Sequence, residues 1–302
     1  MVSWRPWLSV SLFLSSVGFG MVTAGILALA AVGLSLQISV TNVPNFAHGE
    51  LLTCGAYGAL VAQFLTNNLF VDALVGMVVS GVVAFGMNRF ILQSFIKIGT
   101  RRIYLLIVTA GVSLFLQNAL AVVFGEPDRV LTLPSDASQP YHIGPFIWTK
   151  IDLVVMGAAV TAMVLLYLLL QYTRFGKAQR AVADSPELAR VSGVPVKRVV
   201  NLTWILVGVL AGLAGVALAA TSGTVTPPMG GTILLVVFAA AILGGIGKPY
   251  GALVAALVIG VGMEVSAAYI DPAYKEVIAV AILVLAILFR PNGLFSSARE
   301  TW

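Results

Sequence analysis

The run Leu8–Leu34, LSVSLFLSSVGFGMVTAGILALAAVGL, contains no charged residue. About twenty helical residues, each rising roughly 1.5 Å, cross a hydrocarbon layer about 30 Å thick, so this run is long enough to span a membrane. It is too long for the apolar part of a typical secretory signal, and more apolar segments follow it, which favours a span over a cleaved leader. The stretch therefore predicts an integral membrane protein.

The composition of the whole chain agrees with that prediction. Of the 302 residues, 59% are apolar and only 10% are charged, and the mean hydropathy is +1.01. A single water-soluble shell cannot cover so much apolar surface, so the bilayer is expected to be the solvent. The alternating pattern of a membrane β-barrel is absent, and the spans are therefore expected to be helices.

Apolar segments recur along the chain, each bounded by charged residues, proline or glycine. They lie near residues 9–34, 36–62, 69–91, 103–124, 151–172, 199–221, 231–246, 251–270 and 276–290. These segments predict an all-α fold: a polytopic transmembrane helix bundle of about 8–9 membrane segments forming a single domain over residues 1–302. The count depends on 36–62, because the polar break Thr41–Asn45 contains Pro44 and makes this stretch a kinked or re-entrant span.

The positive charges predict the orientation of the chain, since lysine and arginine collect on the cytoplasmic side of short loops. The basic loops contain Arg89, Lys97, Arg101 and Arg102, then Arg174, Lys177, Arg180, Arg190, Lys197 and Arg198, and finally Arg290 and Arg299. The alternate loops are poor in such residues. We therefore place 89–102, 174–198 and the C-terminus in the cytoplasm. We interpret the net charge of +5 as a topology signal, to which membrane lipid, as an anionic partner at the inner leaflet, can contribute, rather than as a nucleic-acid surface.

The long basic loop 173–198 carries the signals of its own short helix. Asp184 or Ser185 can cap its N-terminus, Pro186 suits the first helical position, and Glu187 complements the positive end of the helix dipole. Gly193 ends the helix before Pro195. A helix this short is marginal alone in water, so we expect it to dock against another surface at the cytoplasmic face.

Three stretches of the sequence resemble a known family in the same order. They are Arg174–Asp184 (RFGKAQRAVAD) with Ala189–Gly193, Asn45–Glu50 (NFAHGE) with Gly55–Tyr57, and Leu243–Gly247 (LGGIG) with Phe289–Phe295 (FRPNGLF). Together they resemble the branched-chain amino acid ABC transporter permeases, the hydrophobic amino acid uptake family, in their shorter subunit form. One departure is Thr41–Pro44, where the family more often has a glycine-rich run.

The resemblance implies the permease subunit of an ATP-driven importer in the plasma (inner) membrane of a prokaryote. Its solutes would be branched-chain or other neutral amino acids, or small polar relatives such as urea and amides, moved by alternating access. The implied partners are a homologous second permease, two cytoplasmic ATP-binding subunits and an external solute-binding protein. ATP and magnesium would be held by those partners, with no cofactor on this chain. Coupling to the ATPase is expected at Asp184, Ser185, Pro186, Glu187, Leu188, Ala189 and Gly193.

Polar residues inside the apolar segments are the candidates for the translocation path. We single out Asn45, His48 and Glu50, because ionisable groups are costly in a membrane and often functional there. The alternative is that His48 bonds a neighbouring helix and Glu50 lies at an interface. A second interruption, Pro227-Pro228 before Gly230-Gly231, suggests a further broken helix whose dipole end could face a charged solute.

Several other chemistries are excluded or less favoured. The run Gly244–Lys248 is not a phosphate-binding loop, since Ile242 occupies its first glycine position and Pro249 the magnesium-binding position; a tight turn is expected instead. Two histidines and one cysteine make no plausible metal site. An ion-coupled secondary transporter remains the alternative, and a passive channel a weaker one. Either would leave the capped basic loop without a role.

Overall fold

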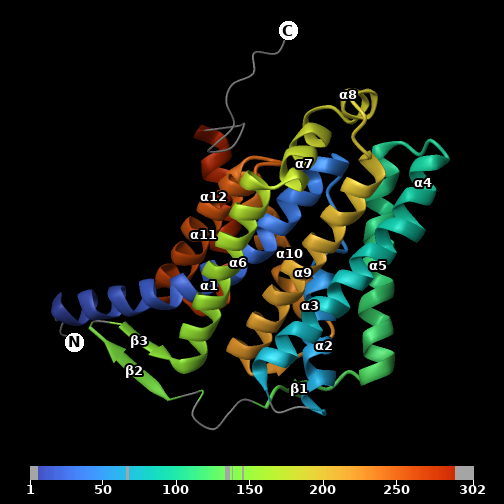
Figure 1. Cartoon of the computed structure of the whole chain (residues 1–302). Coiled ribbons are helices and arrows are strands. Elements are labelled where there is room, and N and C mark those ends of the chain that lie inside the picture. Colours follow the sequence, from blue (N-terminus) through green and yellow to red (C-terminus); the bar gives the residue numbers. More distant parts are fainter. Residues whose placement is uncertain (1–5, 66–67, 133–136, 138, 145, 290–302) are drawn as a thin grey trace.

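The computed structural model describes residues 6–65, 68–132, 137, 139–144 and 146–289 (Figure 1). The helices are α1 (Pro6–Thr41), α2 (His48–Gln63), α3 (Leu69–Gly86), the π-helical turn η1 (Met87–Leu92), α4 (Gln93–Lys97), α5 (Arg102–Phe124), α6 (Lys150–Tyr172), α7 (Arg174–Asp184), α8 (Pro186–Val191), α9 (Val196–Ser222), α10 (Met229–Gly244), α11 (Pro249–Tyr269), the 3-10 turn η2 (Pro272–Tyr274) and α12 (Lys275–Phe289). The strands are β1 (Arg129–Val130), β2 (Pro140–Ile143), β3 (Phe146–Thr149) and β4 (Thr224–Val225).

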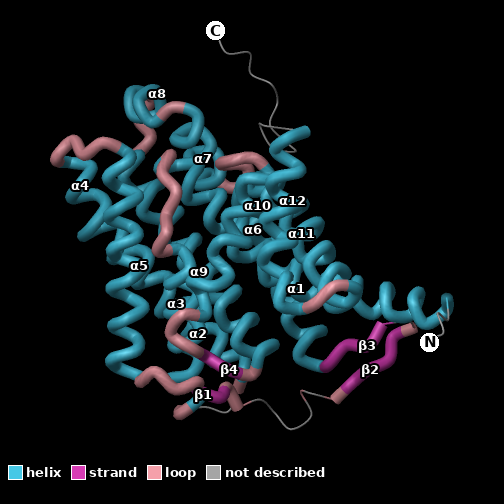
Figure 2. The backbone as a smooth tube through the Cα atoms, turned by 180° about the vertical axis from the view of Figure 1, so that it is seen from behind, coloured by secondary structure: helices cyan, strands magenta, loops and turns pink. Residues whose placement is uncertain are grey.

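The predicted helical bundle is confirmed, with two small additions. Six helices in the described part of the chain are long and apolar enough to cross a membrane: α1, α3 continued to Lys97, α5, α6, α9 and α11. The strands form two antiparallel pairs, β1 with β4 and β2 with β3. Both pairs lie at the end of the bundle opposite α8 (Figures 1 and 2).

The predicted boundary between the first two apolar segments, 9–34 and 36–62, was wrong in position. The sequence divided the opening spans near residue 35, whereas α1 continues without interruption to Thr41. The chain turns at Asn42, which has a positive φ of 52°, and α2 begins at His48. The interruption therefore coincides with the polar stretch Thr41–Asn45, because Pro44 cannot donate in a helix and asparagine tolerates a left-handed backbone.

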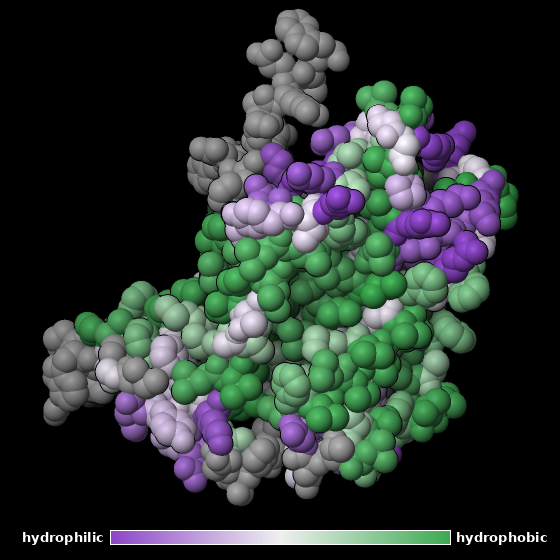
Figure 3. Space-filling model, in the orientation of Figure 1, coloured by the Kyte–Doolittle hydropathy of each residue, from purple (hydrophilic) through white to green (hydrophobic). Residues whose placement is uncertain are grey.

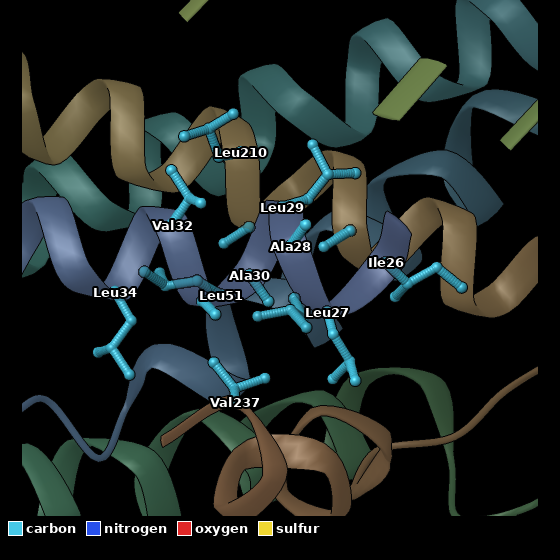
Figure 4. Close-up of a cluster of buried hydrophobic side chains, with 14 of the residues drawn as sticks. Ile26, Leu27, Ala28, Leu29, Ala30, Val32, Leu34, Leu51, Leu210 and Val237 are labelled. Atoms are coloured by element: carbon cyan, nitrogen blue, oxygen red, sulfur yellow. The ribbon is translucent and has the colours of Figure 1, made fainter. Parts of the chain in front are cut away.

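The centre of the bundle is built around α1, which packs against α6, α9, α10 and α11. Figure 4 shows Leu27, Leu34 and neighbouring α1 side chains among Leu51, Leu210 and Val237 from three other helices. Helices α2, α3 and α9 form a second packed group, in which glycines lie at the contacts between the helices. A Cβ on Gly55 would collide with the backbone of Gly212, so these helices touch main chain to main chain.

Helices α2 and α10 are short, at 16 residues each. Such a helix extends only about 24 Å, which is less than the hydrocarbon core of about 30 Å. Each is preceded by an irregular segment that follows a long helix: residues 42–47 after α1, and 223–228 after α9. Backbone of this kind is tolerated at membrane depth only where it is enclosed by protein. The second break that the prolines predicted is thus confirmed.

Hydrophilic residues gather at the end of the molecule that carries α7 and α8, while the middle of the surface is hydrophobic (Figure 3). Lys97, Arg174 and Arg190 belong to elements at this end. The predicted basic residues Arg290 and Arg299, and most of the FRPNGLF motif, lie outside the described residues.

Candidate functional site

The short helix predicted in the basic loop is present as α8. Ser185, not Asp184, is its N-cap: the Ser185 side chain accepts a hydrogen bond from the Leu188 backbone N–H at 3.3 Å. Pro186 occupies the first turn together with Glu187. The helix ends at Val191, and Gly193 follows with a φ of +83°, a backbone conformation that glycine adopts without strain.

The apolar side chains of α8 face two ways. Ala189 is buried with Val40, Val182 and Val199 and holds α8 against the bundle. Leu188 and Val191 are 70% and 88% exposed at the polar end of the molecule. Because most of the surface of both side chains is exposed, α8 presents a small apolar surface outside the bundle.

Helix α7, which precedes α8, was not predicted. Thr173 caps it by accepting a hydrogen bond from the Gly176 N–H at 3.2 Å. The signal was present in the sequence, because Phe175, Ala178 and Val182 are spaced three and four apart, as on one face of a helix. This face packs onto α6, α9 and the end of α1.

One buried hydrogen bond links α7 to α1. The Gln179 side-chain amide donates to the Ser39 hydroxyl at 2.9 Å, and both residues are buried. Ser39 stands three residues before the break at Asn42. The basic loop is therefore attached directly to the point where α1 ends and the chain enters α2.

Asn45 organises the broken segment. Its side-chain amide donates to the side-chain oxygen Oε1 of Gln37 at 3.1 Å, and its own side-chain oxygen accepts from the Ala47 N–H at 3.0 Å. The Phe46 N–H is satisfied by the Thr109 hydroxyl of α5 at 3.3 Å. Because these bonds replace those that a continuous helix would make, Asn45 stabilises the break.

His48 begins α2 and is directed at α1. Its Nε2 lies 3.0 Å from the Ala30 carbonyl oxygen, so this nitrogen carries the proton and donates. Nδ1 has no hydrogen-bond partner among the described residues. Ala30 is eleven residues before the end of α1, so the start of α2 lies about 16 Å inside that end.

Glu50 turns away from α1. One carboxylate oxygen accepts a hydrogen bond from the Ser113 hydroxyl of α5 at 3.2 Å. The other oxygen has no hydrogen-bond partner among the described residues, and the residue is only 1% exposed. Glu50 is in the first turn of α2, where the positive end of the helix dipole stabilises a carboxylate.

The first turns of α2 and α10 meet beside Glu50. Gly49 and Gly230 touch backbone to backbone, and the Gly230 N–H donates to the Thr53 hydroxyl at 3.1 Å. Gly231 is exposed, and a Cβ built there would lie 3.5 Å from the Glu50 carboxylate. Two helix N-termini and one buried acid therefore converge at a point where the first turn of α10 is open at Gly231.

The three predicted path residues do not form one cluster. Asn45 and His48 bond to α1, whereas Glu50 faces α5 and α10. Four cavities formed by the described residues are lined by other side chains. Glu264, an acid inside α11, pairs with Lys275 at 2.7 Å and accepts a bond from Thr23 at 3.0 Å. The sequence could not have indicated Ser113 or Gln179, whose partners are distant along the chain.

Comparisons with known proteins agree with this architecture. The family described as branched-chain amino acid transport system, permease component, matches residues 16–287. The high-affinity branched-chain amino acid transport system permease protein LivH of Salmonella typhimurium is 29% identical over 294 residues, covering 93% of this chain and 95% of its own length. The probable branched-chain amino acid transport permease protein LivH of Methanocaldococcus jannaschii is 30% identical over 308 residues, covering 94% and 95%. The ribose import permease protein RbsC of Escherichia coli is 25% identical over 275 residues, covering 86% and 81%. No solved structure matches the chain.

Proposed function

This chain belongs to the branched-chain amino acid permease family and is a membrane permease subunit of an ABC importer, and we propose that its solute passes beside Glu50. The solutes are branched-chain or other neutral amino acids, or small polar relatives such as urea and amides. The relatives named for branched-chain amino acids support the first of these. Alternating access moves the solute across the membrane.

The observation that carries the path is the meeting of α2 and α10. The Glu50 carboxylate is buried with one oxygen lacking a protein partner, which suits the ammonium group of an amino acid. The exposed first turn of α10 at Gly231 offers a helix N-terminus to the solute carboxylate. Asn45 and His48 contribute by fixing the break that positions Glu50.

The proposed topology has nine crossings among the described residues: α1, α2, α3 to α4, α5, α6, α9, α10, α11 and α12. The end that carries α7, α8 and the basic loops faces the cytoplasm, as the distribution of arginine and lysine favours. The C-terminus follows α12 on this same side. The ends with β1 to β4 face outward, toward an external solute-binding protein.

The proposed assembly contains a second homologous permease and two cytoplasmic ATP-binding subunits. ATP and magnesium are held by those subunits, and this chain binds no cofactor. Residues 173–198 form the coupling loop, in which Leu188 and Val191 offer an apolar contact to an ATP-binding subunit. Asp184, Ser185, Pro186, Glu187, Ala189 and Gly193 shape and anchor that contact.

Transport by the reconstituted importer tests the path. Glu50→Gln removes the charge while keeping the size of the side chain, and KM for the amino acid should rise about 10- to 100-fold, the value of a hydrogen bond to a charged group. Glu264→Gln, the matched control, removes an acid inside α11 and should leave KM unchanged. An unaltered KM in Glu50→Gln would move the path elsewhere.

The same vesicles separate the importer from an ion-coupled carrier. Uptake should stop when ATP is withheld from the ATP-binding subunits and continue when a proton uncoupler is added. Abolition by the uncoupler alone would support the secondary transporter.

A further inference from the structure

An apolar groove runs along the outside of the bundle between α6 and α11. Its volume is about 540 Å³, and nearly all of the surface that lines it is apolar. The floor is formed by small or buried α1 residues, including Ala24, Ala28 and Val32. The rims are exposed side chains, Val160 and Val164 on α6 and Leu257 on α11. The groove is therefore open sideways, in the direction of the bilayer.

The length of the groove corresponds to one leaflet. It follows α1 from Met21 to Val32 and α6 from Met156 to Tyr167. Eleven helical steps on each side give a length of about 17 Å, close to half of a hydrocarbon core of about 30 Å. A solute that passes between water and water has no use for a blind apolar groove of this depth, whereas an acyl chain has these dimensions and this polarity.

The end of the groove nearest α7 carries tyrosine rings and a basic side chain, unlike the apolar remainder. Tyr167 and Tyr250 pack edge to face there, with ring centroids 5.8 Å apart. Arg180 of α7 reaches back to the end of α6, donating to the Leu170 carbonyl at 2.8 Å and to the Gln171 side chain at 3.2 Å. Tyr250 and Arg180 therefore both contact the C-terminal part of α6. A guanidinium has five donors, so these bonds leave others for an anion.

The start of α11 adds to the positive potential at this end. Its N-cap residue, Lys248, makes no side-chain cap, and Pro249 occupies the first position. The first turn of this 21-residue helix contributes Pro249 and Tyr250 to the groove lining, and its first N–H groups have no capping side chain. Tyrosine rings and basic side chains at the end of an apolar surface are the residues that contact lipid headgroups.

We propose that the groove between α6 and α11 binds one acyl chain of an anionic phospholipid from the leaflet on the α7 side. The acyl chain lies over Ala28 between the two helices, and the phosphate lies near Arg180, Tyr250 and the start of α11. Because α6 continues directly into α7 and α8, the lipid occupies the space beside the helix that carries the coupling loop. This inference depends on the membrane location of the chain and not on the path beside Glu50.

Native mass spectrometry of the importer tests the apolar half of the site. The assembly is stripped of lipid with detergent and then titrated with phosphatidylglycerol. Ala28→Phe fills the floor and should weaken the tightest binding event about tenfold or more, since a buried ring displaces the acyl chain. Val164→Trp fills the groove from its exposed rim, without disturbing the packed floor, and should do the same. Val122→Trp introduces the same ring at a more exposed position on α5, away from the groove; it is the control and should bind as the parent does.

Arg180→Gln tests the polar half. One basic side chain near an anionic surface contributes about 1 kcal/mol, so the preference for phosphatidylglycerol over phosphatidylcholine should fall about fivefold. Equal binding of the two lipids by the parent protein would overturn the headgroup assignment. Unchanged lipid binding in both Ala28→Phe and Val164→Trp, or cross-links showing a partner permease seated on α6 and α11, would overturn the groove as a lipid site.

Discussion

At the scale of single residues, the break between α1 and α2 depends on a few side chains that replace helix hydrogen bonds. Asn45 satisfies the Ala47 N–H and the Gln37 side chain at once. Thr109 satisfies the Phe46 N–H from another helix. In a membrane no water is at hand to take over these bonds, so the residues that supply them are under strong structural constraint.

Asn45→Ala should therefore destabilise the protein. The substitution removes the hydrogen bonds to the Ala47 N–H and to the side-chain oxygen of Gln37, at a cost of about 1–3 kcal/mol for each buried group. The apparent melting temperature in detergent measures the effect. Asn118→Ala on α5, where the exposed amide bonds only the Leu114 carbonyl, is the control and should change little. Equal melting temperatures for both variants would contradict the role given to Asn45.

Gly55 is expected to tolerate no side chain. A Cβ at this position would meet the Gly212 backbone, so Gly55→Ala must push α2 and α9 apart, costing about 1–3 kcal/mol as overpacking. Gly111→Ala on α5 meets nothing within 4 Å and should be neutral or slightly stabilising. Thermal unfolding of the two variants side by side measures the difference, and a stable Gly55→Ala protein would show that the interface can repack.

At the scale of elements, the proposed coupling loop, residues 173–198, combines an exposed apolar surface with two contacts to the bundle. Leu188 and Val191 are exposed on α8, Ala189 fixes α8 to the bundle, and Gln179 ties α7 to Ser39. A force applied to α8 therefore reaches the end of α1, and through it the break that positions Glu50. This arrangement gives the proposed alternating access a physical connection.

Leu188→Asp should separate ATP hydrolysis from uptake. The exposed side chain contributes nothing to the packing of the spans, but a charge in an apolar contact should weaken docking of the ATP-binding subunit about tenfold. Uptake and ATPase activity are measured in the same vesicles. Ile98→Asp places the same charge at an exposed apolar position after α4, outside residues 173–198, and should transport normally. Ala189→Asp is unsuitable for this test, since Ala189 is buried and its replacement would unfold α8.

Gln179→Ala tests the hydrogen bond that joins α7 to α1. ATP-binding subunits should still associate, because α8 is untouched, while uptake per ATP hydrolysed should fall as the α7 to α1 link is lost. Ser39→Ala removes the acceptor of the same hydrogen bond and should give the same ratio. If both variants keep the parent's ratio of uptake to ATP hydrolysed, the motion of α8 is transmitted to the spans through another contact.

At the scale of the whole molecule, the orientation of the bundle can be measured with introduced cysteines. Cys54, the one native cysteine, is buried, so its replacement by alanine gives a suitable background. Val191→Cys on α8 should react with a membrane-impermeant maleimide only in inverted vesicles, and Tyr141→Cys on β2 only in intact cells. Labelling in the reverse pattern would place the coupling loop outside, where no ATP-binding subunit can reach it.

The elements were predictable to different degrees. The apolar runs and their proline or glycine limits correctly indicated most helices, because hydrophobic length is a local property. Capping correctly located α8 through Ser185 and Gly193. The end of α1 was misplaced, because Leu34–Thr41 contains polar residues that α7 and the break satisfy. The strands were missed because their pairing partners are remote in sequence or lie in a loop of mixed polarity.

The sequence by itself determined that this chain spans a membrane, that non-helical segments at Thr41–Asn45 and at Pro227-Pro228 separate its apolar stretches, and that a capped helix lies in its basic loop. Each follows from residues that are neighbours along the chain. Only the tertiary structure decided that the first turns of α2 and α10 meet. It also decided that Glu50 faces Ser113 while His48 faces Ala30, and that Gln179 reaches Ser39. These contacts depend on how each helix is rotated and tilted against its neighbours, and that is set by packing between segments far apart in sequence.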